Sequence, residues 1–168
     1  MLGTVNMEVL SHPNPVLKQT ALEVDPSGDT ELRPLVQGMV RVMREAPGVG
    51  LAAPQIGVQK RVIVVEVEED KIAALCNPCI VDSSEETEVD DEGCLSLPGI
   101  SVPVERNASV TCEALTISGQ AVRIDAYGLL ARVLQHEIDH LDGLLIIDRA
   151  APDERKAALR RYHDLLAG

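Results

Sequence analysis

The sequence is poor in aromatic side chains. Its 168 residues include no Phe, no Trp and only two Tyr, Tyr127 and Tyr162. Proteins that bind single-stranded RNA or DNA stack bases on aromatic rings, so this composition argues strongly against a binder of that kind. The hydrophobic core must instead be built from Val, Leu, Ile, Ala and Met.

Positive charge is also scarce. The chain has 15 Lys and Arg against 27 Asp and Glu, which gives a formal net charge of -12 and a pI near 4.7. Proteins that bind along a nucleic-acid backbone neutralise many phosphates with Lys and Arg. We therefore expect no DNA partner.

Long apolar runs are missing as well. No stretch approaches the ~20 apolar residues that a membrane-spanning helix needs. The segment 1–10 lacks the basic start and apolar run of a secretory signal, so we expect a cytoplasmic protein with no membrane partner. Disulfides are rare in the reducing cytoplasm, where the cysteines of a protein more often serve as metal ligands, catalysts or core residues. The chain has four of them: Cys76, Cys79, Cys94 and Cys112.

The order of periodic segments predicts the fold class. Apolar residues at spacings of three and four predict helices at about 30–45, 127–141 and 152–167. Strand-like segments lie at 61–67, 74–81, 108–117, 121–125 and 144–147, and the third and fourth form a hairpin. Because strands and helices are segregated, we expect a single α+β domain over 1–168. Its sheets are mostly antiparallel and surround the second helix, and a helix ends the chain.

Some charged and polar residues are expected to have no special role. Seven acidic residues lie between 82 and 92, and such a run is typical of a solvated loop or an exposed sheet edge. His12 and His163 are expected at the surface. Cys112 alternates with apolar neighbours and is expected in the core.

The strongest chemical signal is His136-Glu137-Ile138-Asp139-His140, within the second predicted helix. Residues four apart lie on one face of a helix, so both imidazoles can bind one metal ion. Glu137 follows the first ligand, where its carboxylate can act as general base on a metal-bound water. The alternative is a solvated helix with two surface histidines.

A catalytic metal site usually has three protein ligands, so a third one is needed. A histidine six residues after the second one is excluded, because residue 146 is Ile. Cys94 follows a glycine and offers a thiolate, which binds borderline and soft divalent ions strongly. Downstream carboxylates also remain as candidates: Asp148, Asp153, Glu154 and Asp164.

The pair Cys76 and Cys79 competes for the same role. It forms a CxxC motif, but the chain has no second CxxC to complete a zinc knuckle. We interpret these two cysteines as small residues on a strand, before and after a turn.

The segment 48–55 reads Gly-Val-Gly-Leu-Ala-Ala-Pro-Gln. Its first six residues formally fit a dinucleotide-binding fingerprint, which must follow a strand and open a helix. Here a predicted helix ends just before the segment, and Pro54 breaks any helix just after it. We therefore interpret it as a tight loop that faces a substrate and ends in an amide donor, Gln55.

Taken together, these three segments resemble the motifs of the peptide deformylase family. The family has a GxGxAAPQ-type loop, an EGCLS motif and a QHExDH motif, and the sequence contains all three in that order at 48–55, 92–96 and 135–140. Flanking stretches at 12–17 and 128–132 are also similar. The resemblance covers most of residues 7–150.

The resemblance implies a metal-dependent hydrolase that removes the N-formyl group from the initiator methionine of nascent polypeptides and releases formate. It implies that Cys94, His136 and His140 bind the metal and that Glu137 is general base and acid. The oxyanion would be held by the Gln55 side chain and the Leu95 amide. Fe²⁺ is the expected ion, with Zn²⁺, Ni²⁺ or Co²⁺ as substitutes.

The resemblance further implies an ion pair between Glu92 and Arg106. The methionine pocket would be lined by Val49, Gly50, Leu129 and Val133. Two positions depart from the family pattern. Ser101 replaces a larger residue, and Asp90 stands where an apolar pocket residue can occur.

Alternatives remain for both function and partners. The rival functions are an HExxH metallopeptidase with a downstream carboxylate ligand and a metal-binding module without turnover. The last predicted helix carries a basic face, which the resemblance relates to contact with the ribosome; a solvated helix is the alternative. That face is formed by Arg155, Lys156, Arg160 and Arg161.

Overall fold

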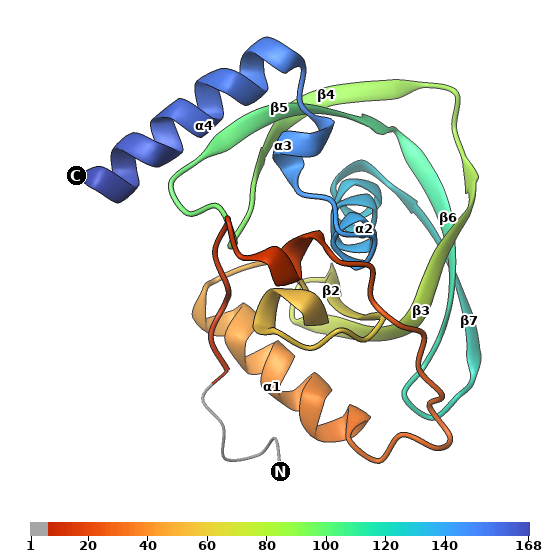
Figure 1. Ribbon diagram of the computed structural model, residues 1–168. Helices are drawn as coiled ribbons and strands as arrows, with labels where there is room; N and C mark the ends of the chain where they lie inside the picture. Colours follow the sequence, from red (N-terminus) through yellow and green to blue (C-terminus); the bar gives the residue numbers. More distant parts are fainter. Residues whose placement is uncertain (1–6) are drawn as a thin grey trace.

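The computed structural model describes residues 7–168 (Figure 1). The first six residues, part of the segment judged against a secretory signal, lie outside the described residues. The helices are α1 (Leu32–Glu45), α2 (Gly128–Leu141), α3 (Ile146–Arg149) and α4 (Pro152–Ala167), with 3₁₀ turns at Pro15–Lys18 and Ala53–Ile56. The strands are β1 (Gly50–Ala52), β2 (Val62–Glu68), β3 (Lys71–Ser83), β4 (Thr87–Gly93), β5 (Ser101–Asn107), β6 (Ser109–Leu115) and β7 (Ala121–Tyr127).

Two antiparallel sheets surround helix α2. The larger sheet has the strand order β1-β2-β3-β6-β7, and β4 pairs with β5 in a second, two-stranded sheet. Figure 1 shows α2 in the centre of the molecule, enclosed by these strands. The predicted α+β class, the central helix and the C-terminal helix are confirmed. None of the described helices is both long and apolar enough to cross a membrane.

Strand β2 explains how the larger sheet is covered on both faces. Successive strand residues point to opposite faces, and Val62 to Val65 are all fully buried. Ile63 and Val65 pack in a core cluster with the apolar side of α2, whereas Val62 and Val64 pack in another with α1. The continuous apolar run of β2 therefore reflects helices on both sides of the sheet.

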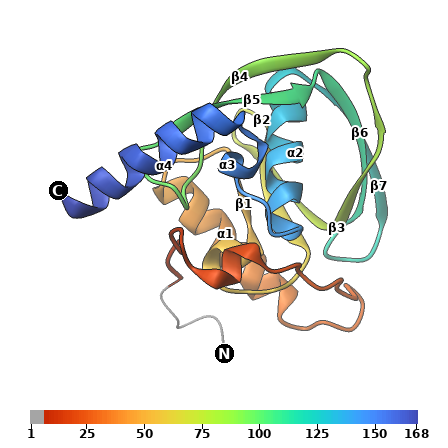
Figure 2. The same cartoon turned by 45° about the horizontal axis from the view of Figure 1, so that its top comes forward.

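A third core cluster fixes the C-terminal helices against β5. It joins the apolar residues of α3 to Val102 and Val104 of β5 and to Tyr162 of α4. Figure 2 shows α3 and α4 beside this sheet. His12, expected at the surface, is half-buried there, and its carbonyl accepts a hydrogen bond of 2.6 Å from the Tyr162 hydroxyl. His163 is exposed, as expected.

Three elements differ from the sequence-based expectations. Residues 144–147 do not form a strand: Leu144 and Leu145 are extended, and α3 begins at Ile146. A short apolar run does not distinguish a buried strand from a buried helix, and here Asp148 accepts the Leu145 amide and closes a helical turn. Strand β5 was not predicted, because Pro103 and the charges at its end disfavour a strand.

The third difference concerns the CxxC motif. Cys76 and Cys79 both lie in β3, on either side of a β-bulge rather than a turn. Asn77 takes the left-handed conformation there, and its side chain hydrogen-bonds the backbone of Val24. The residues between the two cysteines therefore form a bulge in β3. Cys112 is buried in the core, as expected.

The acidic run and the 48–55 loop match their interpretations. Residues 82–91 lie on or between the exposed strands β3 and β4, and only Glu92 is buried. The loop follows α1 and continues into β1 and a single 3₁₀ turn, so the context of a dinucleotide fingerprint is inverted. Gly50 pairs with Val65 and brings the loop against α2.

Gly143 ends helix α2 and lets the N-terminal arm pack against it. Its φ is +76°, and a Cβ at this position would lie 2.5 Å from the Lys18 carbonyl oxygen. Gly119, in the β6–β7 turn, has a φ of +87°, but a Cβ there would meet nothing within 4 Å. A substitution by alanine at Gly119 would therefore meet only the cost of a left-handed backbone, whereas at Gly143 it would meet that cost and a steric clash.

We predict that Gly143→Ala destabilises the fold more than Gly119→Ala. The left-handed backbone alone costs about 1–2 kcal/mol for alanine, and the clash with Lys18 adds about 1–3 kcal/mol at Gly143. Urea unfolding of both variants measures the difference. Equal losses would contradict the steric role of this glycine.

Candidate active site

The three candidate metal ligands converge from two different elements. Cys94 directly follows β4, and His136 and His140 lie one turn apart on the same face of α2. The Cys94 Sγ lies 3.4 Å from His140 Nε2, which lies 3.2 Å from His136 Nε2. All three ligand atoms lie within 4.8 Å of one another.

These separations fit a single tetrahedral ion. Bonds of about 2.0–2.1 Å to nitrogen and about 2.3 Å to sulfur place ligand atoms about 3.3–3.6 Å apart. A thiolate with two imidazoles suits borderline divalent ions rather than Mg²⁺ or Ca²⁺. The donor set therefore fits a divalent transition-metal ion.

Cys94 resolves the choice of third ligand. Among residues 7–168, Cys94, His136 and His140 form the group that can hold an ion. Asp148 instead accepts hydrogen bonds from Lys18, Arg155 and the Leu145 amide. The other carboxylate candidates, Asp153, Glu154 and Asp164, are exposed on α4.

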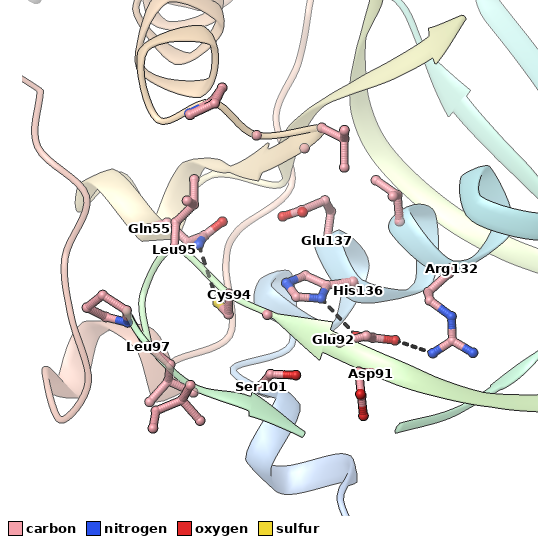
Figure 3. Close-up of a pocket in the computed structure, with 18 of the residues that line it drawn as sticks. Gln55, Asp91, Glu92, Cys94, Leu95, Leu97, Ser101, Arg132, His136 and Glu137 are labelled. Carbon is pink, nitrogen blue, oxygen red and sulfur yellow. Dashed lines mark hydrogen bonds and ion pairs between the residues drawn. The ribbon is translucent and has the colours of Figure 1, made fainter. Parts of the chain in front are cut away.

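Glu92 orients the first histidine. Its Oε1 lies 3.0 Å from His136 Nδ1, which leaves Nε2 to face Cys94 and His140 (Figure 3). A carboxylate on the far ring nitrogen is the usual support for a metal-binding histidine. Arg106 donates to both Glu92 oxygens, at 2.9 and 3.0 Å, so the predicted ion pair is present.

The charge on Glu92 is well supported despite its burial. Burial alone would raise the pKa of this carboxyl group, but hydrogen bonds from His136 and Arg106 lower it to about 2. Arg106 also donates to Asp139, which in turn accepts two hydrogen bonds from Arg149. A chain of alternating charges, buried except for Arg149 at its end, thus extends behind the metal ligands.

The two imidazoles differ in their affinity for protons. Burial opposes protonation of His136, but Glu137, Cys94 and Glu92 raise its pKa to about 10. Burial and the neighbouring His136 lower the pKa of His140 well below its ordinary value. Because a proton and a metal ion use the same lone pair, ion binding at His136 competes with protonation of its ring.

Glu137 lies beside the ligands with an unusual environment. Its side chain is buried, its Oε1 has no hydrogen-bond partner within residues 7–168, and burial raises its pKa to about 7. Gly50 permits this position, since a Cβ there would lie 2.7 Å from Glu137 Oε2. The carboxyl group is thus suited to gain and lose a proton near neutral pH.

Two hydrogen-bond donors lie close to Cys94, the Gln55 side chain and the Leu95 amide. The Gln55 Oε1 accepts the Ala52 amide at 3.0 Å, which turns Nε2 toward Cys94 Sγ at 3.8 Å and Ser96 Oγ at 3.2 Å. The Leu95 amide donates to no acceptor in the described part of the chain. Both groups flank Cys94.

The site opens into a cavity of about 570 Å³. Its walls include all four residues expected for the methionine pocket, Val49, Gly50, Leu129 and Val133. Ser101 also lines it, and so does Asp91 in place of the neighbouring Asp90, which points elsewhere on the exposed strand β4. Figure 3 shows the cavity between β4, the 48–50 loop and α2.

Two charged residues of α2 lie at the site but were not predicted from the sequence, Asp139 and Arg132. Asp139 is buried and joins Arg106 to Arg149, and Arg132 lines the cavity beside Glu92. The spacing of residues along α2 could have indicated Arg132. Arg132 precedes His136 by four residues and therefore lies on the same helix face.

We predict that Glu92→Gln lowers the free energy of unfolding at neutral pH. We also expect the free energy of unfolding of this variant to change less between pH 7 and pH 3 than that of the unmodified protein. The folded-state pKa of about 2 lies below the ordinary 4.5, so the ionised group stabilises the fold above pH 4.5. That contribution is lost as the pH falls toward 2. Breaking this buried pair costs about 3 kcal/mol at pH 7. Urea unfolding of metal-free protein from pH 7 to pH 3 measures it, and parallel curves for the two proteins would contradict the prediction.

Comparison with known proteins identifies the family. The model of the family described as polypeptide deformylase matches residues 6–156. A peptide deformylase of Natranaerobius thermophilus is 52% identical over 143 residues, covering 85% of this chain and 91% of the relative. One of Acidothermus cellulolyticus is 48% identical over 151 residues, covering 90% and 82%.

Solved structures agree with the sequence relatives. A peptide deformylase of Legionella pneumophila superposes with a TM-score of 0.90 at 38% identity, covering 97% of this chain and 96% of the other. One of Synechococcus elongatus in complex with actinonin gives 0.87 at 38% identity, covering 94% and 86%. The motifs, the Cys-His-His cluster and these matches lead to one conclusion: the chain belongs to the polypeptide deformylase family.

Proposed function

We propose that this enzyme removes the N-formyl group from the initiator methionine of nascent polypeptides through the residues of the cavity described above. The observation that carries the proposal is the convergence of Cys94, His136 and His140 beside a cavity that Cys94, His136 and Glu137 line together with apolar residues. The reaction consumes water and yields formate and a free amino terminus.

Cys94, His136 and His140 would hold the ion. A divalent ion supplies Lewis acidity, which lowers the pKa of a coordinated water from 15.7 toward about 7 and polarises a carbonyl group. Fe²⁺ is our proposal for the resident ion because the resemblance to the family implies it, with Zn²⁺, Ni²⁺ or Co²⁺ as substitutes. A thiolate and two imidazoles are compatible with all four ions.

Glu137 would move the protons of the reaction. As a carboxylate it accepts a proton from the attacking water, and as a carboxylic acid it delivers that proton to the departing amine. Its burial favours the neutral form and so keeps the two states close in free energy near pH 7. Its unpartnered Oε1 leaves one oxygen free to reach the substrate.

Gln55 and Leu95 would stabilise the negative charge that develops on the formyl oxygen. Gln55 is held by the Ala52 amide, so its NH₂ group needs no rearrangement when charge appears. The Leu95 amide has no competing acceptor in the described chain. Losing one such donor typically costs about 3–4 kcal/mol of transition-state stabilisation.

The cavity walls would select the substrate. An unbranched methionine side chain is flexible and apolar, and it fits a space lined by Val49, Leu129 and Val133. A formyl carbon carries only hydrogen, so a close approach around Cys94 and Glu137 excludes larger acyl groups by steric contact. No downstream carboxylate lies near the ligands among residues 7–168, which disfavours the metallopeptidase alternative.

We predict that Glu137→Gln keeps its metal and loses activity. The variant preserves shape but cannot carry a proton, so formate release from a formyl-Met peptide should fall about 10²–10⁴-fold. Metal analysis and a formate assay measure the two properties, with Glu154→Gln on exposed α4 as the control. Full activity would reject Glu137 as the base. Cleavage of internal peptide bonds by the unmodified enzyme would support the metallopeptidase instead.

Helix α4 carries basic side chains that could bind a second partner, the ribosome. Arg155 is paired with Asp148, and Arg161 donates to the Ser101 carbonyl. Lys156 and Arg160 are exposed and make no ion pair with any described residue. Nascent chains emerge from ribosomes in the cytoplasm, and we propose that these two side chains contact ribosomal phosphates there.

Charge reversal of Lys156 and Arg160 to Glu should weaken co-sedimentation with ribosomes at low salt, since each cation is expected to displace counterions on phosphate. The control reverses Lys71 and Arg123, two exposed residues of the larger sheet, and changes the net charge equally. If both double variants bind ribosomes alike, α4 is a solvated helix.

A further inference from the structure

We propose that Arg132 is a positioning residue for the metal centre, acting through Glu92. The inference rests on the metal site of the proposed function and assigns a role to a side chain outside the three family motifs. Arg132 lies on α2, one turn before His136, and its side chain is only 12% exposed at the cavity wall.

The Arg132 guanidinium connects three elements. Its Nη1 donates to Glu92 Oε2 at 2.6 Å and to the Val104 carbonyl of β5 at 2.9 Å. Its Nη2 donates to the Glu88 carbonyl of β4 at 2.9 Å. One planar group thus joins α2 to both strands of the smaller sheet, and only a guanidinium offers donors in this forked geometry.

The Glu92 carboxylate is held from two successive turns of the same helix. Its Oε2 accepts Arg132, and its Oε1 faces His136 Nδ1 at 3.0 Å, as the dashed lines of Figure 3 show. Rotation of the carboxylate would therefore break the contact with one helix turn or the other. Arg106 binds the same two oxygens from β5 and does not replace the constraint from α2.

This arrangement links the two halves of the ligand set. Cys94 follows β4, whereas His136 and His140 belong to α2, so their separation depends on how β4 is held against the helix. Arg132 grips β4 at Glu88 and at Glu92, on the strand that leads directly to Cys94. Its loss should loosen both the His136 ring and the strand that carries the thiolate.

The test measures Zn²⁺ affinity of metal-free protein by chelator competition, together with kcat and KM of the metal-saturated enzyme. Arg132→Met should weaken Zn²⁺ binding about 10–100-fold, the usual cost of losing an outer partner of a ligand. We expect kcat to fall by a larger factor than KM changes, since the residues expected to contact the methionine side chain, Val49, Leu129 and Val133, are unaltered.

Arg61→Met is the matched control. Arg61 is similarly buried, at 17% side-chain exposure, and donates two hydrogen bonds to the C-terminal end of α2, at Leu141 and Asp142, without touching Glu92. Its loss removes an anchor of the same helix but should leave Zn²⁺ affinity and kcat within about twofold. Equal losses in the two variants would overturn the inference.

A double-variant cycle tests whether Arg132 acts through Glu92. In the Glu92→Gln background, Arg132→Met should cause a much smaller loss of Zn²⁺ affinity than in the unmodified protein, because the charged contact is already broken and only the Glu88 and Val104 contacts remain to be lost. Losses that multiply would overturn the inference, and so would wild-type affinity in Arg132→Met. If the unmodified protein itself fails to bind Zn²⁺, the metal site of the proposed function is wrong, and that result is distinct from the others.

Circular dichroism of the metal-free proteins shows whether Arg132→Met folds. If it does not, Arg132→Lys is the variant to test. Lysine retains the charge but lacks the fork that reaches both strands. We expect a loss of Zn²⁺ affinity above that of Arg61→Met. Full retention of affinity would show that charge alone suffices and would overturn positioning by the fork.

Discussion

Everything in the active site depends on bringing one sulfur and two imidazole nitrogens together from separate parts of the fold. The two histidines require only a helix, since residues four apart share a face. The sulfur belongs to Cys94 at the end of β4, and this strand pairs with β5 alone within residues 7–168. Ion pairs join this sheet to α2 instead: Glu92 pairs with Arg132 and His136, and Arg106 pairs with Asp139.

This arrangement also explains why so many charges are buried in a small protein. Isolated buried charges are costly, and removing one partner of a buried pair leaves the other uncompensated. Here Glu92 and Asp139 alternate with Arg106, Arg132 and Arg149, so each carboxylate faces at least two guanidinium groups. The network stiffens the support of the ligands, and the metal ion adds its own charge in front of it.

Glu137 follows the opposite principle. It lies next to the same network but makes no hydrogen bond with one of its oxygens, and its burial raises its pKa to about 7. Glu92 and Glu137 are both buried glutamates beside His136, yet one is held ionised and the other is left free to change state. Environment rather than residue type thus distinguishes the structural carboxylate from the one that we propose to be catalytic.

The sequence by itself determined the helix that carries HExxH, the C-terminal helix, the hairpin of β6 and β7, and the family motifs. These features depend on periodicity and spacing within a short segment, which are local properties. Three-dimensional packing alone decided that 144–149 turns into α3 and that Pro103 lies in a strand. The family resemblance already implied Cys94 as a ligand, and packing brings it to the two histidines. The role of Arg132 could not be predicted from the sequence either. It depends on the Glu92 carboxylate and on two backbone carbonyl groups, which strands distant in the sequence place beside it.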